Sequence, residues 1–187
     1  INLLRQASSS NDLESIYMLA KCLRKKGLNE MDFDILEEAF ILFEKAAKKG
    51  HPGASYEFAM IFSQGYEIYI DREKASKFFT IASEKNHPQA TTELGKFYEL
   101  QQDKEMAFKL YNKATNLGDN EGIFHLAMCY LNGVGVDTDK VKARNLMEKA
   151  SEQGITDAKL QLGFMYKEGI GGPKDEIKSF KLFDELF

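Results

Sequence analysis

Apolar positions along this chain follow a helical period. From about residue 12 onward, large apolar residues recur three, four and seven positions apart, with lysine, glutamate and other polar residues between them. Strict alternation of apolar and polar residues, the mark of a half-buried strand, is hard to find, and only three prolines interrupt the chain. The pattern therefore predicts an all-α protein.

The helical segments recur as a repeat, at spacings of 32 to 39 residues. A small residue opens the first helix of each unit: Ser15, Ala54, Ala90, Gly122 and Ala158. Another small residue marks each second helix: Ala39, Ala75, Ala107, Ala143 and Ser179. Small residues on facing sides let two helices approach closely, so we expect five antiparallel helix pairs. The expected units are about 12–50, 51–86, 87–118, 119–154 and 155–187, in one repeat domain over 1–187 that is a fragment of a longer chain.

Polar residues and glycines stand where such helices should begin and end. Four aspartates lie four positions before the small residue of a second helix, where a carboxylate accepts hydrogen bonds from free backbone N–H groups: Asp71, Asp103, Asp139 and Asp175. Gly50, Gly118 and Gly154 follow second helices, as C-terminal caps do. The first unit departs from this scheme, because its connection, Gly27 to Asp34, is expected to be longer.

The stretch YLNGVGVDTDKVKA, from Tyr130 to Ala143, looks in isolation like a phosphate-binding loop. Its glycine pair, Gly133 and Gly135, recurs 36 residues later in YKEGIGGPKDEIKS. No strand precedes it, and it lacks the spacing of a nucleotide-binding fingerprint. We therefore predict a turn between antiparallel helices.

These residues together resemble the Sel-one-like repeat family, which is related to the tetratricopeptide repeats. The unit from Gly122 carries the family pattern at Leu126, Ala127, Tyr130, Gly133, Gly135, Val136, Asp139, Lys142 and Ala143. The unit from Ala90 departs from it, because it lacks the glycine turn and is four residues shorter. The resemblance implies a right-handed α-solenoid that serves as a protein-binding scaffold or adaptor.

Composition narrows the partners. The net charge is −4, a mildly acidic balance that argues against nucleic acid, and no apolar stretch approaches membrane-spanning length. The two cysteines, Cys22 and Cys129, are far apart and are read as small core residues. Their isolation weakly favours a reducing compartment such as the cytoplasm, and the compartment is otherwise unknown.

Candidate chemistry is sparse. His51 and His87 occupy equivalent turns in neighbouring units, and His125 is expected at a helix surface. No cysteine or histidine lies near them at ligand spacing, and no nucleophile stands beside a base. The sequence therefore predicts no enzymatic activity, no cofactor and no metal site.

Partner binding is expected on one face of the first helices. In solenoids of the resembled kind these helices line the concave surface, so positions two, six and nine after the opener should face a groove for a protein or peptide. Lys21, Arg24 and Lys96 at these positions could hold acidic groups of a bound peptide. The candidates are Tyr17, Lys21, Tyr56, Met60, Lys96, Phe124, Met128, Leu160 and Phe164. Thr92 falls at the same position as Tyr17. The alternative is that such residues pack against the neighbouring repeat.

The last helix is apolar to its end, at Leu182, Phe183, Leu186 and Phe187. Repeat arrays normally close with a polar cap, so this face is a candidate for end-to-end contact. It supports a rival function, in which the chain is a structural spacer or a regulatory subunit region of a multidomain protein.

Overall fold

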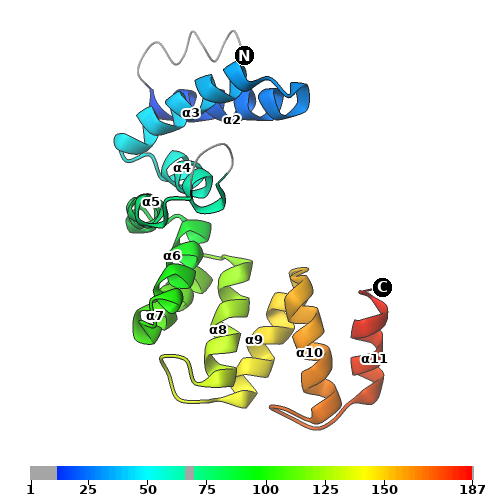
Figure 1. The fold of residues 1–187 in the computed structure, drawn as a ribbon. Coiled ribbons are helices and arrows are strands. Elements are labelled where there is room, and N and C mark those ends of the chain that lie inside the picture. Colours follow the sequence, from blue (N-terminus) through cyan, green and yellow to red (C-terminus); the bar gives the residue numbers. More distant parts are fainter. Residues whose placement is uncertain (1–11, 66–69, 187) are drawn as a thin grey trace. The chain divides into compact units, whose positions relative to one another are not determined.

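The computed structural model describes residues 12–65 and 70–186, and within them every regular element is a helix. Figure 1 shows α2 (Leu13–Glu30), α3 (Phe33–Lys48), α4 (Pro52–Gln64), α5 (Arg72–Glu84), α6 (Pro88–Leu100), α7 (Lys104–Asn116), α8 (Asn120–Asn132), α9 (Lys140–Glu152), α10 (Thr156–Glu168) and α11 (Glu176–Asp184). The helices follow one another as five pairs, each a first and a second helix. The prediction of an all-α helical repeat fold is confirmed.

The chain divides into two compact units, Ile1–Ala90 and Thr91–Phe187. We call them the N-terminal and C-terminal units. The first holds the pairs α2–α3 and α4–α5, and the second holds the pairs α8–α9 and α10–α11 together with α7 and most of α6.

The expected caps are present. The side chains of Asp71, Asp103, Asp139 and Asp175 each accept a hydrogen bond from the backbone N–H three residues on, at 2.9 to 3.1 Å. These bonds satisfy donors that the first turn of a helix leaves without an intrahelical partner. The starts of four second helices therefore follow from local sequence alone.

Each unit has its own core. In the N-terminal unit Phe58 is fully buried, with the rings of Phe62 and Phe78 at 5.0 and 4.8 Å. In the C-terminal unit Met147 and Tyr111 are fully buried. A Cβ on Gly95 would lie 2.6 Å from the Tyr111 ring, so the missing side chain lets α6 and α7 pack together.

The glycine-rich loop is a turn between α8 and α9, as predicted. Gly133 ends α8 at φ 71°, and Gly135 has φ 68°. A Cβ on Gly135 would overlap the backbone carbonyl oxygen of Lys104, and Gly171 stands in the same relation to Lys140. The second glycine is therefore required by close approach to the preceding repeat as well as by its backbone angle.

The first repeat differs from expectation. The predicted long connection from Gly27 to Asp34 is wrong, because α2 continues to Glu30 and Asp32 already caps α3. Gly27 lies inside α2, where an added Cβ would be 2.7 Å from Cγ of Leu36. It serves close helix packing rather than a turn, and α2 gains an additional turn that no other first helix has.

Candidate protein-interaction surface

We call the nine predicted partner-binding residues the first-helix face. Two of them, Tyr17 and Tyr56, lie against the start of the next repeat. The Tyr17 and His51 rings are 4.6 Å apart, and the Tyr56 and His87 rings are 4.8 Å apart and nearly parallel. His51 caps α4, since its Nδ1 accepts a hydrogen bond of 3.1 Å from the Ala54 N–H. Both tyrosines are half-buried, and their main contacts are in the packing of one repeat against the next.

The same position in the C-terminal unit makes an equivalent contact with different chemistry. Thr92 is buried, and its hydroxyl donates to the Asp119 carboxylate at 2.5 Å. Asp119 in turn caps α8 through the N–H of Gly122. The expectation that Thr92 faces a groove is wrong, because a buried hydroxyl needs a partner and the next repeat's cap supplies it.

Lys96 is part of a charged cluster on α6 and α8. Its ammonium group lies 2.8 Å from a carboxylate oxygen of Glu93 and 2.8 Å from one of Glu121. Burial acts to lower the pKa of Lys96, but the two carboxylates outweigh it and the pKa is raised. The lysine is therefore charged, and its two carboxylates are the groups with which an incoming ligand would compete.

The remaining members of the first-helix face differ in exposure. Met60 and Met128 are half-buried, as is Phe124, which packs against the core around Met147. Lys21 is exposed in the N-terminal unit. Leu160 and Phe164 on α10 are 37% and 46% exposed. The parts of this face open to a partner are thus centred on Lys21 in one unit and on α10 in the other.

His125 is not at the surface, and that expectation is wrong. Its ring is half-buried and stacks on Tyr111, with centroids 4.8 Å apart and planes at 14°. Burial, and secondly the charge of Lys96, lower the pKa of His125. Tyr111 donates its hydroxyl to Glu99 at 2.7 Å. This aromatic stack joins α7 to α8 and leaves the histidine neutral at physiological pH.

Neither cysteine forms a disulfide. Cys129 is buried, and burial raises the pKa of its thiol to about 12. Among the described residues, no group of three or more histidine, cysteine or acidic side chains is placed to hold a metal ion. In this described part, every helix is too short or too polar to cross a membrane.

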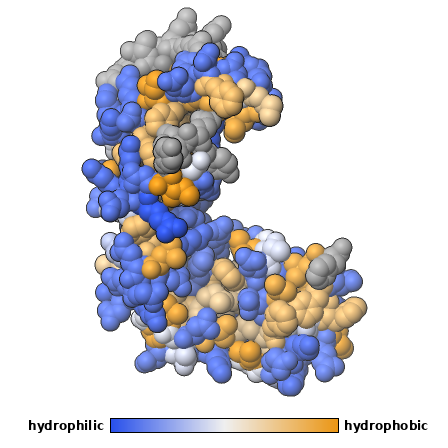
Figure 2. Space-filling view, viewed as in Figure 1, coloured by the Kyte–Doolittle hydropathy of each residue, from blue (hydrophilic) through white to orange (hydrophobic). Residues whose placement is uncertain are grey.

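The final repeat exposes apolar residues at positions that the sequence reading missed. Of the predicted terminal contacts, Leu182, Phe183 and Leu186 are half-buried, and Phe187 lies outside the described residues. Ile177 and Phe180 on α11 are instead 72% and 71% exposed. Figure 2 shows hydrophobic residues gathered over α10 and α11. A signal was available, because Phe180 aligns with Phe108, which packs against Tyr130 of the following repeat at 5.6 Å.

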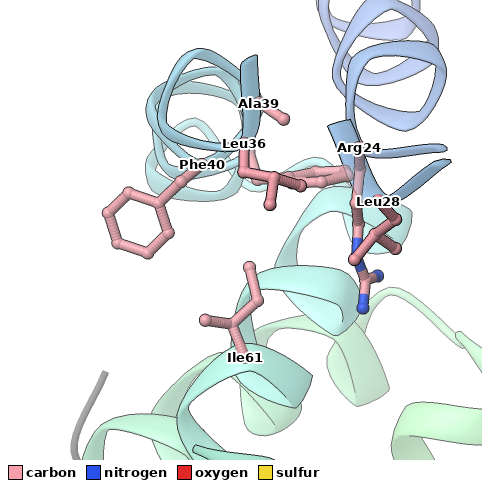
Figure 3. A pocket seen from close by; sticks show the side chains of 7 residues that line it. Arg24, Leu28, Leu36, Ala39, Phe40 and Ile61 are labelled. Carbon is pink, nitrogen blue, oxygen red and sulfur yellow. The ribbon is translucent and has the colours of Figure 1, made fainter. Parts of the chain in front are cut away.

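A pocket of about 230 Å³ opens between α2, α3 and α4 of the N-terminal unit. Figure 3 shows Leu36 and Ile61 on opposite sides of it, with Arg24 and Leu28 along the α2 side. The Arg24 guanidinium is paired with Glu57 at 2.5 Å. The pocket is lined by none of the nine residues of the first-helix face and was not expected from the sequence.

Five repeats of helix pairs, with capped second helices and a repeated glycine turn, define a helical-repeat scaffold. The Sel1 repeat model matches residues 13–51, 52–87, 88–119, 120–155 and 156–185. The chain therefore belongs to the Sel1 repeat family, and proteins of this family generally mediate protein–protein interaction.

The chain is similar to fungal proteins in sequence and to a solved bacterial structure in fold. The chain is 33% identical over 99 residues to the chitin synthase regulator SKT5 of Saccharomyces cerevisiae, covering 51% of this chain and 14% of that protein. It is 29% identical over 142 residues to chitin synthase regulatory factor 2 of Schizosaccharomyces pombe, covering 68% and 27%. The chain thus spans less than a third of either relative. Among solved structures, a protective antigen of uropathogenic Escherichia coli with an SLR fold superposes with a TM-score of 0.88, at 25% identity, over 98% of this chain and 40% of that one.

Proposed function

We propose that this chain is a non-catalytic adaptor that binds a peptide or protein surface through its first-helix face. The observation that carries the proposal is the exposure of Leu160 and Phe164 on a first helix. A helix face that only meets water is usually polar, whereas exposed apolar groups beside charged ones mark partner sites. In the N-terminal unit, the exposed Lys21 on α2 offers a separate charged contact for a partner.

The names of the two fungal relatives narrow the choice of binding partner. Both are named as regulators of chitin synthase, so we propose that the partner of this chain is a chitin synthase or a protein that acts on one. In this reading the repeats hold the synthase or its associate, and no chemistry is needed from the repeats themselves.

The test is affinity capture from a detergent-solubilised lysate of the source cells, with captured proteins quantified by mass spectrometry. The first bait variant combines Leu160→Ala with Phe164→Ala. The matched control combines Val141→Ala with Ile177→Ala, which removes exposed apolar groups from second helices of the same unit. All baits are first shown to have unchanged helicity and melting.

A partner that is lost from the first-helix variant and retained by the control is the expected result. Equal capture by both variants would refute the role of this face. A chitin synthase, or a protein bound to one, among the selectively lost partners supports the narrower proposal, and a partner set without either refutes it.

A rival function is favoured by one observation, the exposure of Ile177 and Phe180 on α11. In that reading the chain is a spacer or regulatory region that makes its contact through this terminal face. It predicts the opposite outcome, with capture lost in the control variant that carries Ile177→Ala and retained when Leu160 and Phe164 are changed.

A further inference from the structure

The pocket between α2, α3 and α4 exists because the first repeat departs from the pattern of the others. The helix α2 has 18 residues, whereas the other first helices have 13. The additional residues carry Leu28 to the pocket mouth, and Leu36 lies at a position where the later repeats have Arg72, Lys104, Lys140 and Glu176. The pocket is therefore a local addition to a scaffold that folds without it elsewhere.

The pocket lining is apolar and open to a ligand. Leu28 is 57% exposed at its mouth, while Leu36 and Ile61 form buried walls. Small-molecule sites usually have about 300–1,000 Å³, so a volume of about 230 Å³ suits one or two apolar side chains better than a cofactor. The pocket has the size of an anchor site for a peptide.

The α2 side of the pocket is basic. Four of the six residues from Lys21 to Lys26 are lysine or arginine, and none is acidic. Lys26 is 3.6 Å from Glu30, whereas Lys21 and Lys25 are exposed. Arg24 uses Nη1 for Glu57, and a guanidinium carries five N–H donors in all. This edge therefore presents positive charge directly beside an apolar hole.

Carboxylates offset two of these four charges, those of Arg24 and Lys26, and Lys21 and Lys25 supply the remaining positive charge. Glu57 is already paired with Arg24, and Asp32 accepts a hydrogen bond from the Ile35 N–H as the cap of α3. Glu37 is exposed on α3, directly after the pocket residue Leu36 in the sequence. A ligand with acidic groups is thus drawn to the α2 side and repelled from the α3 side, which fixes its orientation.

We propose that this pocket binds an acidic peptide segment that inserts a leucine-like side chain between Leu36 and Ile61 and sets its carboxylates against Lys21, Arg24 and Lys25. The inference rests on the proposed function, since it names the partner chemistry for the N-terminal unit. Apolar burial supplies the affinity, and the basic edge selects acidic over basic sequences.

The probe is a fluorescein-labelled helix-forming peptide of glutamates and leucines, with leucines three and four positions apart, and binding is read by fluorescence anisotropy. Two control peptides replace every glutamate by lysine or every leucine by alanine. The protein variants are Leu28→Ala and Lys25→Glu. Their matched controls are Leu100→Ala and Lys109→Glu, which change exposed residues of the same types in the C-terminal unit.

Each pocket variant is expected to weaken binding by about three- to tenfold, because truncating a partly exposed leucine or reversing an edge charge changes affinity by about 1 kcal/mol. The control variants are expected to bind within about twofold of wild type, since neither touches the pocket. Binding of the lysine peptide with equal affinity, or equal effects of Leu28→Ala and Leu100→Ala, would overturn the proposal.

The outcome separates this inference from the proposed function. Failure of the acidic peptide to bind wild type, together with partner capture that still depends on Leu160 and Phe164, removes the pocket proposal and leaves the adaptor proposal standing. Peptide binding that Leu28→Ala weakens and Leu100→Ala does not, without any face-dependent partner capture, supports the pocket proposal and removes the proposal for the first-helix face.

Discussion

Substituting alanine for Gly135 tests whether the second glycine of the turn is required by packing or by backbone angle alone. A left-handed backbone costs a residue with a Cβ about 1–2 kcal/mol, and Gly135 has φ 68°. The new Cβ would also overlap the Lys104 carbonyl oxygen and lie 3.0 Å from Cβ of Phe108. Backbone atoms cannot move aside cheaply, and overpacking typically costs about 1–3 kcal/mol.

Gly118 provides the matched control. It has φ 87°, but a Cβ there would meet nothing within 4 Å. Its substitution by alanine carries only the backbone cost, which is reduced by about 0.4–1 kcal/mol because alanine restricts the unfolded chain. We therefore expect Gly118→Ala to lower the free energy of unfolding by about 1 kcal/mol or less, and Gly135→Ala by about 2–4 kcal/mol.

Urea unfolding followed by circular dichroism measures the difference. With a slope of about 2 kcal/mol per molar urea, the midpoint of Gly135→Ala should lie about 1 M below that of Gly118→Ala. Equal midpoints for the two variants would show that the close approach to Lys104 has no energetic consequence, and the packing account of the glycine turn would be wrong.

Three further predictions concern Arg144, His125 and the two cysteines, which differ in burial. Arg144→Ala should lower the free energy of unfolding by about 2–3 kcal/mol in urea titrations, because the buried guanidinium donates two hydrogen bonds to the Pro173 carbonyl, and a loss below 0.5 kcal/mol would contradict this. Burial lowers the pKa of His125, so the unfolded chain binds a proton more readily than the folded chain does. The contribution of the neutral His125 to the free energy of unfolding is therefore complete above about pH 6.5 and is lost as the pH falls through the folded pKa. His125→Gln should reduce the decline in the urea midpoint between pH 7 and pH 5. Because burial raises the pKa of the Cys129 thiol to about 12, iodoacetamide should alkylate Cys22 before Cys129 in the native protein. Alkylation in the reverse order, read by mass spectrometry, would show that Cys129 is not the less reactive thiol.

Much of the fold follows from local sequence. Aspartate caps such as Asp71 and glycine ends such as Gly133 act within a few residues of where they stand, so their spacing alone predicted helix boundaries. The repeat multiplied that information, because each boundary could be checked against the same position in other units. Gly27 shows the limit, since whether a glycine ends a helix or packs inside it depends on Leu36, which lies across the helix pair.

The candidate surface was harder to predict. The helical period predicts which residues point away from their own helix pair. It does not predict which of these residues the next repeat covers. Thr92 donates a hydrogen bond to Asp119, which lies 27 residues later at the start of the next repeat. Tyr17 likewise packs against His51 at the start of the repeat that follows it. The pocket beside Leu28 depends on the actual length of α2, which the sequence reading ended too early.

Hydrogen exchange of this chain, with and without its captured partner, tests the central claim most directly. The account predicts that the partner slows amide exchange in the first helices, which are α2 and α4 in one unit or α8 and α10 in the other. The amide exchange rates of the second helices α5 and α9 should remain unchanged. Protection confined to the second helices, or to α11 alone, would contradict binding through the first-helix face.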